Sequence, residues 1–204
     1  MPCRMTADID TLRAALRASG DRSSDFDLNP DVSIPGGRVL RDAAVLVAIM
    51  EGADGLDVLL TKRSSALKHH PGQVAFPGGK KDNDDADLPA TALREAWEEV
   101  RLNPDHVDII GTLPTHETVT SFTVTPVVGL VTGDFQAEIE PNEVAEAFTV
   151  PLHHVLDPDR YRVESRLWQG RRRYYYAVPF GPYYIWGATA RILRGLADRV
   201  ASCR

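Results

Sequence analysis

The sequence predicts a domain of the α+β class, in which helices and a β-sheet are packed in layers. Three observations lead to this class. Short runs of apolar and β-branched residues alternate with amphipathic helical patterns along the chain. Glycine turns separate consecutive strands. The 204 residues, 43% hydrophobic and 25% charged, can bury one substantial core. We expect the element order β-β-helix-β-β-helix-β-β-helix.

The composition also excludes several classes of protein. A formal net charge of −6 argues against general binding to nucleic acids or anionic membranes. Cys3 and Cys203 lie at opposite ends, which gives neither a disulfide framework nor a metal-ligand spacing. The longest apolar run, residues 43–50, is too short to span a bilayer, and the N-terminus lacks the apolar core of a signal peptide. We therefore expect a soluble, cytoplasmic protein with neither a nucleic acid nor a membrane as its partner.

The first expected element is a short amphipathic helix over residues 9–19, with apolar residues at helical spacing: Leu12, Ala15 and Leu16. Residues 21–37 are polar and contain glycines and prolines, so they predict an arm. We expect residues 1–37 to pack on a main domain of residues 38–204. Packing alone explains this segment, and the alternatives are a pocket cover or the interface of a homodimer.

Two strands follow the arm. Residues 43–50 are apolar throughout, as expected for a strand buried on both faces. Residues 56–61 are a second β-like run, and the glycine-containing turn between the two runs predicts a hairpin.

A basic patch without acidic residues comes next: Lys62, Arg63, Lys68, His69 and His70. Such a patch beside a metal–carboxylate helix would hold a polyphosphate. The alternative is a solvated loop whose charges offset the acidic residues 82–87. Metal binding is expected neither at this histidine pair nor at His153-His154, because no third ligand is apparent.

Residues 76–102 contain the helix around which the chemistry is organised. A tight turn at Gly78-Gly79 leads through an acidic loop into the helical pattern. One arc of this helix is apolar and should face a core: Leu93, Ala96, Trp97 and Val100. The opposite arc, with Arg94 at its edge, carries three carboxylates: Glu95, Glu98 and Glu99.

Carboxylates at helical spacing repel one another and destabilise a helix unless something compensates. A hard divalent cation would compensate, because it takes several oxygen ligands and brings water to a phosphate. Glutamates on a helix otherwise form an ordinary solvated face, but the glycine turn and acidic loop favour the metal site here. Arg94, four residues before Glu98, would hold that carboxylate in place.

Two further strands are predicted after this helix, at residues 107–113 and 122–131. Glu117 lies in the loop between them and is a candidate base. The next acidic stretch contains Glu140 and Glu143.

The C-terminal part predicts a hairpin and a helix. Residues 161–168 and 171–179 flank a Gln-Gly turn. Three arginines followed by three tyrosines invite comparison with nucleic-acid binding, but alternate residues of a strand face opposite sides, so a barrel-edge or interface role is favoured. Residues 184–201 predict a terminal helix with apolar residues at helical spacing: Ile185, Ala188, Ile192, Leu196 and Val200.

Two adjoining stretches resemble the Nudix family. The family pattern G-x5-E-x7-R-E-U-x-E-E-x-G-U, where U is apolar, is matched in its second half by Arg94, Glu95, Ala96, Glu98, Glu99 and Leu102. The first glutamate is absent and Asp85 is the nearest acid. The spacing from Gly79 to Arg94 is one residue longer than the pattern, and Arg101 replaces the last glycine.

The preceding stretch resembles the signature of the coenzyme A diphosphatase branch, L-L-T-x-R-S-x3-R-x3-G-x3-F-P-G-G. The matching residues are Leu59, Leu60, Thr61, Arg63, Ser64, Gly72, Phe76, Pro77, Gly78 and Gly79. Lys68 stands where arginine is usual, which keeps the charge but loses the bidentate geometry.

This resemblance implies the Nudix α/β/α sandwich with a mixed sheet, its helix packed by Leu93, Trp97 and Val100. It implies Mg²⁺ or Mn²⁺ held by Glu95, Glu98, Glu99 and the Gly79 carbonyl. The implied catalytic residues are Arg94, Glu98, Glu99 and Glu143. In many members of the family a glutamate beyond the motif completes the metal site or acts as the base, and Glu143 is the first candidate for it and Glu140 the second. The implied substrate-binding residues are Lys62, Arg63, Ser64 and Lys68.

The implied reaction is hydrolysis of the diphosphate of coenzyme A or acyl-CoA. It gives 4′-phosphopantetheine, or its acyl form, and adenosine 3′,5′-bisphosphate. Two alternatives stay open: a diphosphatase for another nucleoside diphosphate derivative such as ADP-ribose, and a non-catalytic nucleotide-sensing module. Such modules tend to lose the carboxylates of the pattern, whereas all three are present here.

Overall fold

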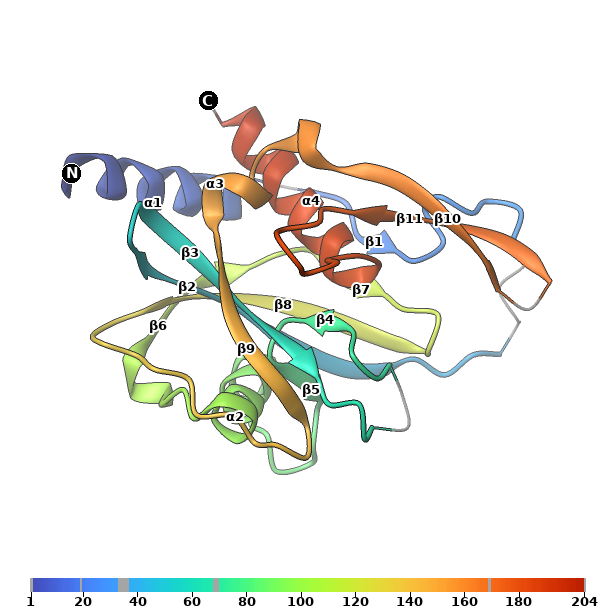
Figure 1. Ribbon diagram of the computed structural model, residues 1–204, viewed down its shortest axis with the longest axis horizontal. Helices are drawn as coiled ribbons and strands as arrows, with labels where there is room; N and C mark the ends of the chain where they lie inside the picture. The colour runs from blue at the N-terminus through green and yellow to red at the C-terminus, as the bar shows by residue number, and fades with distance from the viewer. Residues whose placement is uncertain (1, 19, 33–36, 68–69, 169, 204) are drawn as a thin grey trace.

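The protein forms three layers. The computed structural model describes residues 2–18, 20–32, 37–67, 70–168 and 170–203. Within them, one face of a mixed nine-stranded sheet is covered by α2 (Leu88–Val100). The other face is covered by three helices (Figure 1): α1 (Pro2–Arg17), α3 (Leu152–Val155) and α4 (Ala188–Ser202). The expected α/β/α layering with a mixed sheet is confirmed.

The sheet is centred on β2 (Arg41–Gly52), which runs parallel to β8 (Phe122–Val131) and antiparallel to β3 (Gly55–Arg63). The hairpin expected between the first two long strands is therefore present. The remaining strands of this sheet are β1 (Ser23–Ser24), β4 (Val74–Ala75), β5 (Gly78–Lys80), β6 (Val107–Thr112), β7 (His116–Glu117) and β9 (Val144–Pro151).

A second, two-stranded sheet lies on the side of α4 (Figure 1) and consists of β10 (Arg162–Trp168) and β11 (Arg171–Ala177). This is the hairpin that the sequence predicts near the C-terminus. Two 3₁₀ turns each lie between a helix and a strand: η1 (Pro104–His106) between α2 and β6, and η2 (Pro158–Arg160) between α3 and β10. No described helix is both long and apolar enough to cross a bilayer.

The two faces of the large sheet bury separate cores. On one face the small side chains of Ala92 and Ala96 let α2 approach β2 closely, and both are fully buried. The other core is larger and joins the sheet to α1 and α4. Its fully or nearly fully buried members include Leu12, Ala15, Val47, Leu60, Leu193 and Leu196.

Side-chain and backbone caps fix both ends of α2. Asp87 accepts a hydrogen bond from the Ala90 amide at 2.8 Å and so caps the first turn. The helix ends at Arg101, whose φ of 58° is left-handed. Glycine adopts this conformation without strain, which explains the glycine of the pattern. Arg101 offsets the strain by lying over the Trp97 ring and donating to the Trp97 carbonyl at 3.2 Å.

Trp97 was expected in the core, and this expectation is wrong. Its side chain is 45% exposed on the outer face of α2. The buried arc of the helix is narrower than the wheel suggested, because small residues and Val100 fill the contact with β2. The indole instead lies beneath the Arg101 guanidinium.

Three further elements differ from expectation. β9 was not anticipated; it pairs antiparallel with β3 along most of its length and borders the sheet there. The N-terminal helix starts at Pro2 rather than at residue 9 and ends at Arg17. The last helix starts at Ala188 rather than at residue 184, because residues 178–186 form bridged turns before it.

The N-terminal arm is tied to the domain by buried polar contacts. The fully buried His116 ring contacts the Ser23 hydroxyl at 2.9 Å and the Asp25 carboxylate at 3.1 Å. The Asn29 side chain exchanges two hydrogen bonds with the Tyr174 backbone, at 2.8 and 2.9 Å. The arm therefore fixes the position of β11 relative to the sheet.

Candidate active site

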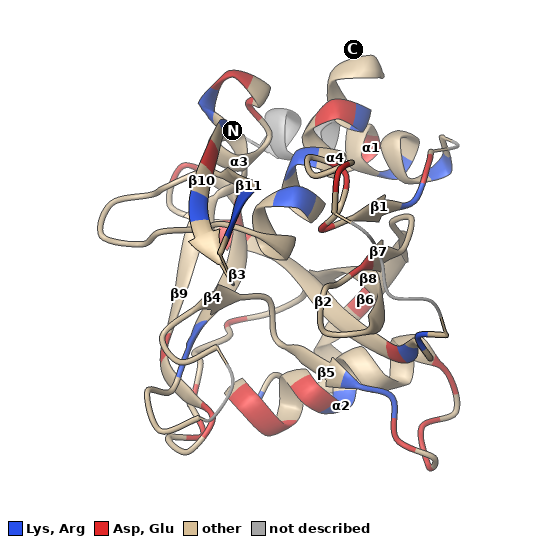
Figure 2. Ribbon diagram, turned by 90° about the vertical axis from the view of Figure 1, so that its right-hand side faces the viewer, with Lys and Arg blue, Asp and Glu red and all other residues tan. Residues whose placement is uncertain are grey.

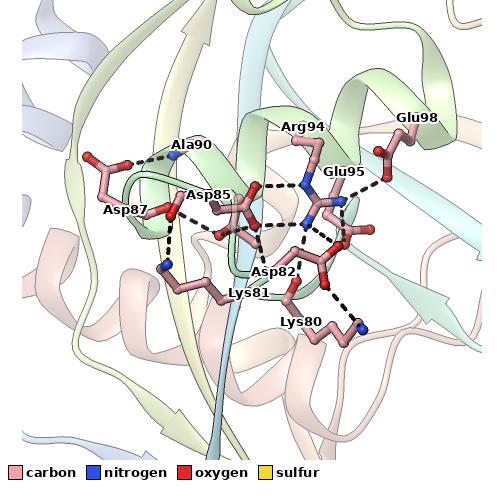
Figure 3. Close-up of polar contacts among 10 residues, drawn as sticks. Lys80, Lys81, Asp82, Asp85, Asp87, Ala90, Arg94, Glu95 and Glu98 are labelled. Atoms are coloured by element: carbon pink, nitrogen blue, oxygen red, sulfur yellow. Dashed lines mark hydrogen bonds and ion pairs between the residues drawn. The ribbon is translucent and has the colours of Figure 1, made fainter.

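The acidic loop before α2 is organised around Asp85 (Figure 3). This buried carboxylate accepts two hydrogen bonds from the Arg94 guanidinium, at 2.8 and 3.0 Å. The Thr91 hydroxyl and the Asp82 amide each donate to it at 2.9 Å. These bonds, led by those from Arg94, hold the pKa of Asp85 well below its usual range although burial opposes the shift. Asp85 thus anchors Arg94 despite the irregular spacing of the pattern.

Arg94 also connects two of the candidate metal-binding glutamates. Its Nη1 lies 3.1 Å from Glu95 Oε1 and 2.9 Å from Glu98 Oε2. The predicted contact between Arg94 and Glu98 is therefore present. The hydrogen bonds to Asp85 are the largest cause of a raised Arg94 pKa, so the guanidinium stays charged. The Arg94 guanidinium thus orients Asp85 of the preceding loop together with Glu95 and Glu98 of α2.

Gly79 provides the surface on which the Glu95 carboxylate rests. A Cβ at this position would lie 2.4 Å from Glu95 Oε1 and 2.6 Å from its Cδ. No side chain other than hydrogen fits without moving the carboxylate. Gly78 is equally restricted, because its Cβ would lie 2.5 Å from the Ala44 carbonyl oxygen across the β2–β5 pairing. The two glycines therefore bring the turn against both the helix and the sheet.

Glu99 is the most unusual of the three glutamates because it is only 3% exposed. The pKa of its carboxyl is raised to about 8, mainly by burial and in addition by the Glu95 and Glu143 carboxylates. The Arg63 charge and a hydrogen bond with the Gly78 backbone partly oppose this rise. Glu95 has a raised pKa as well, again mainly through burial. The loop after β8 reaches this end of α2, since the Glu140 amide donates to the Glu99 carbonyl at 2.9 Å.

These residues suit a hard divalent cation. Their donors are all oxygens, and a buried carboxylate with two like-charged neighbours gains from a cation. Among the described residues, no three acidic, histidine or cysteine side chains are drawn together to metal-binding distance. Arg94 lies between Glu95 and Glu98 instead. Glu95, Glu98 and Glu99 would hold such a cation, which would compete with Arg94 for the Glu95 and Glu98 carboxylates.

A cleft of about 440 Å³ lies on the opposite side of the sheet from α2. It is bordered by the β10–β11 hairpin, the loop of residues 118–120 and the start of α4. Its floor is apolar and includes Val45, Phe76, Val124 and Ile192. Arg63, at the end of β3, lines this cleft and also lowers the pKa of Glu99. The Arg63 guanidinium therefore belongs both to the cleft and to the surroundings of the acidic cluster, which consists of Glu95, Glu98, Glu99 and Glu143.

The other candidate substrate-binding residues occupy different positions. Lys62 is exposed on β3. Ser64 is buried, its hydroxyl accepts the Ala66 amide at 3.4 Å, and its own amide donates to the Glu143 carbonyl at 2.8 Å. Ser64 thus holds the turn that carries Glu143. Lys68 and His69 lie outside the described residues.

The candidate bases differ in their surroundings. Glu143 is exposed and close enough to Glu99 and Glu95 to raise both pKa values. Glu140 lies 3.7 Å from Arg101 in an ion pair. Glu117 pairs with Arg38 at 3.1 Å and lies on β7, so it is engaged in holding the arm. Position alone favours Glu143 among the three.

Basic residues gather on the side of the sheet opposite α2. Figure 2 shows acidic residues along α2, and basic residues on β10, β11 and α4 together with acidic ones on β10 and α4. Arg166 and Arg173 face the cleft from the hairpin, together with Trp168 and Tyr175. From the sequence we expected a barrel-edge or interface role for the arginines and tyrosines of residues 171–176, and Arg166 and Trp168 were not singled out. Their alternation along two paired strands is the signal that could have placed them on one face.

Comparison with known proteins agrees with this fold. The NUDIX domain model matches residues 40–174, and the chain belongs to the Nudix family of hydrolases. Proteins from Enterobacter sp. (strain 638) and Cronobacter sakazakii, both named as an uncharacterized Nudix hydrolase NudL, are each 45% identical to it over 160 residues. Each alignment covers 78% of this chain and 83% of the relative.

Solved structures support the same fold. A MutT protein from Methanosarcina mazei Go1 matches with a TM-score of 0.52 and 20% identity, over 81% of this chain and 96% of that one. A MutT/nudix family protein from Enterococcus faecalis matches with a TM-score of 0.52 and 15% identity, over 85% of this chain and 66% of that one. Membership of the family places the activity among hydrolases of nucleoside diphosphate derivatives.

Proposed function

We propose that the protein hydrolyses the diphosphate linkage of coenzyme A or acyl-CoA. The products are 4′-phosphopantetheine, or its acyl form, and adenosine 3′,5′-bisphosphate. The observation that carries the proposal is the position of Arg63. This residue of the coenzyme A diphosphatase signature lines the cleft and acts electrostatically on Glu99 of the acidic cluster. A diphosphate beside Arg63 would therefore lie between a binding cleft and the carboxylates.

The metal site of this proposal consists of Glu95, Glu98, Glu99 and the Gly79 carbonyl. When bound there, Mg²⁺ or Mn²⁺ supplies charge neutralisation of the diphosphate and lowers the pKa of an attacking water. The protein contributes the geometry: Arg94 aligns two carboxylates, and the Gly78-Gly79 turn brings the backbone close. Hydrolysis of a P–O–P linkage needs mainly such positioning and electrostatic stabilisation.

Glu143 is the proposed base. It is exposed and stands beside the buried Glu99, where it can accept a proton from water. Ser64 supports it by donating its amide to the Glu143 carbonyl. Arg63 neutralises the diphosphate, and Lys62 and Lys68 add positive charge to the same stretch.

A non-catalytic nucleotide-sensing module is a weaker explanation of this site. Such a module needs only to bind its ligand, and nothing in binding requires a carboxylate buried against two others. Ionising the buried Glu99 is unfavourable, as its raised pKa shows. Repulsion among these carboxylates is relieved when a divalent cation binds, so the arrangement suits an enzyme that uses such a cation.

A substrate panel tests the proposal. The protein is incubated with Mg²⁺ and with coenzyme A, dephospho-coenzyme A, ADP-ribose, NADH or deoxynucleoside triphosphates, and kcat/KM is measured for each. We expect the highest value for coenzyme A. Efficient hydrolysis of ADP-ribose with coenzyme A left intact would contradict the substrate assignment while leaving the diphosphatase chemistry in place.

A further inference from the structure

Two arginines stand directly opposite each other on the hairpin. Arg166 of β10 is the cross-strand partner of Arg173 of β11. Like charges in directly opposed positions destabilise a β-hairpin. No ion pair with an acid is found for either guanidinium in the part of the chain that the structure describes. In this part of the chain the pair therefore has no carboxylate to offset its two positive charges, and an anionic ligand would offset them.

The acid nearest along the same face of the hairpin does not supply that anion. Glu164, two residues before Arg166 on β10, accepts a hydrogen bond from the Tyr184 hydroxyl at 2.5 Å. Tyr175, its cross-strand partner, extends this contact, because its hydroxyl lies 3.3 Å from that of Tyr184. The hairpin thus keeps its own carboxylate engaged and leaves the arginine pair without one.

Both guanidiniums are held over indole rings. Arg166 Cζ lies 4.4 Å from the centre of the Trp186 ring, and Arg173 Cζ lies 4.3 Å from that of Trp168. Stacking fixes the position of a guanidinium without using the N–H groups at its edge. Those donors remain able to form bidentate hydrogen bonds with a phosphate. The pair is therefore positioned in advance of any ligand.

The same four residues line the cleft that Arg63 enters. The acid among the cleft's described lining is Asp25, which already contacts His116 and accepts the Val119 amide at 2.9 Å. The cleft therefore has Arg63 at the end near the acidic cluster and the Arg166–Arg173 pair on its hairpin wall. One ligand lying in it can meet two separate cationic centres.

We propose that the Arg166–Arg173 pair binds a phosphomonoester of the substrate, separate from the diphosphate that is hydrolysed. A phosphomonoester carries roughly −1.5 to −2 charges near pH 7, which two guanidiniums neutralise. The inference rests on the proposed function and makes it more specific. The preferred substrate is a nucleoside diphosphate ester with an additional phosphate on its nucleoside, and coenzyme A satisfies this requirement through its 3′-phosphate.

The test compares ligands that differ only in that phosphate. We expect the double variant Arg166→Gln/Arg173→Gln to lower kcat/KM for coenzyme A by about 30-fold, mainly through KM. For dephospho-coenzyme A the change should stay within about twofold. The matched control is Arg172→Gln, on the opposite face of β11, where the side chain donates to Ser165 at 3.0 Å. This control replaces one arginine of the same hairpin by glutamine, and kcat/KM should stay unchanged for both substrates.

A binding measurement separates this inference from the proposed function. Calorimetry with adenosine 3′,5′-bisphosphate and with AMP needs no turnover. The unmodified protein should bind the bisphosphate at least about tenfold more tightly, and the double variant should lose that preference. Absence of the preference in the unmodified protein, or equal losses for both substrates in the variant, would overturn the subsite. If neither coenzyme is hydrolysed, the proposed function fails, and the binding preference still decides the subsite.

Discussion

At the scale of single residues, Glu99 determines how the site responds to pH. Its folded-state pKa of about 8 lies above the ordinary value of 4.5. A carboxyl with a raised pKa binds its proton more tightly in the folded state, so its contribution favours folding below about pH 4.5 and is lost as the pH rises toward 8. Without a cation, the site therefore loses stability on the alkaline side.

Glu99→Gln should remove this loss. In chelator-containing buffer at pH 8.5 the variant should be more stable than the unmodified protein by on the order of 2 kcal/mol, since one pKa unit corresponds to about 1.4 kcal/mol. Urea unfolding at pH 5 and at pH 8.5 measures the difference. The same pH dependence in both proteins would show that Glu99 is not the responsible group.

Arg63 is the residue that distinguishes the two phosphate sites. Because it acts on Glu99, we place it at the diphosphate rather than at the additional phosphomonoester. Arg63→Ala should therefore lower kcat/KM for coenzyme A and for dephospho-coenzyme A equally, by about tenfold or about 1.4 kcal/mol. Steady-state kinetics with both substrates measure this. A loss confined to coenzyme A would move Arg63 to the phosphomonoester.

At the scale of elements, the loop before α2 shows how this sequence satisfies an irregular pattern. This sequence lacks the first glutamate of the family pattern, yet Asp85 accepts two hydrogen bonds from Arg94. The family pattern identified Arg94, and the four-residue helical spacing predicted its contact with Glu98. It could not show that Asp85 is buried, because that depends on how the loop folds over Thr91. The position of Trp97 was wrongly predicted for a different reason. A helical wheel gives the direction of each side chain but not the width of the face that the helix buries.

Asp85→Asn tests this loop. The lowered pKa of Asp85 means that its charged form stabilises the fold above about pH 4 and that this stabilisation is lost as the pH falls below that value. The variant should be less stable at pH 7 by about 2–3 kcal/mol, as expected when a buried charged hydrogen-bond acceptor is removed. Its stability should also fall less on acidification.

Asp84→Asn is the matched control, because Asp84 is exposed in the same loop. Its effect on unfolding in urea should stay within about 0.5 kcal/mol. Equal effects of the two substitutions at pH 7 would mean that the contact between Asp85 and Arg94 contributes nothing specific.

At the scale of the whole molecule, the sheet separates the acidic helix from the cleft, and the end of β3 connects them. Sequence patterns predicted the layered α+β class, the acidic helix and the long strands other than β9, because each has its own periodicity, and the α/β/α order of the layers came from the family resemblance. The cleft could not be predicted in this way. Its walls come from the arm, β3, the loop after β7, the hairpin and α4, which only the folded chain brings together. β9 was not predicted because its exposed residues interrupt the apolar run that would indicate a strand.

A divalent cation should stabilise the whole fold through this site. At a concentration about 100 times its Kd, a ligand adds about 2.7 kcal/mol. This corresponds to a rise in Tm of about 5 °C or more for a domain of this size. Thermal unfolding at pH 8 with Mg²⁺ or with chelator measures the rise, which should be absent in a Glu98→Gln/Glu99→Gln variant. An equal rise in that variant would place the cation elsewhere.

The central claim is that the carboxylates of α2 direct the cleavage of the diphosphate of coenzyme A. Mass analysis of the products tests it most directly, with the unmodified protein, with Glu98→Gln and with the exposed control Glu138→Gln. With Mg²⁺, the unmodified protein and the control should form 4′-phosphopantetheine and adenosine 3′,5′-bisphosphate in equal amounts. Glu98→Gln should stay folded and form both at least about 100-fold more slowly. Two results would contradict the claim. One is the formation of inorganic phosphate and dephospho-coenzyme A as the products from coenzyme A, and the other is an unchanged rate in Glu98→Gln.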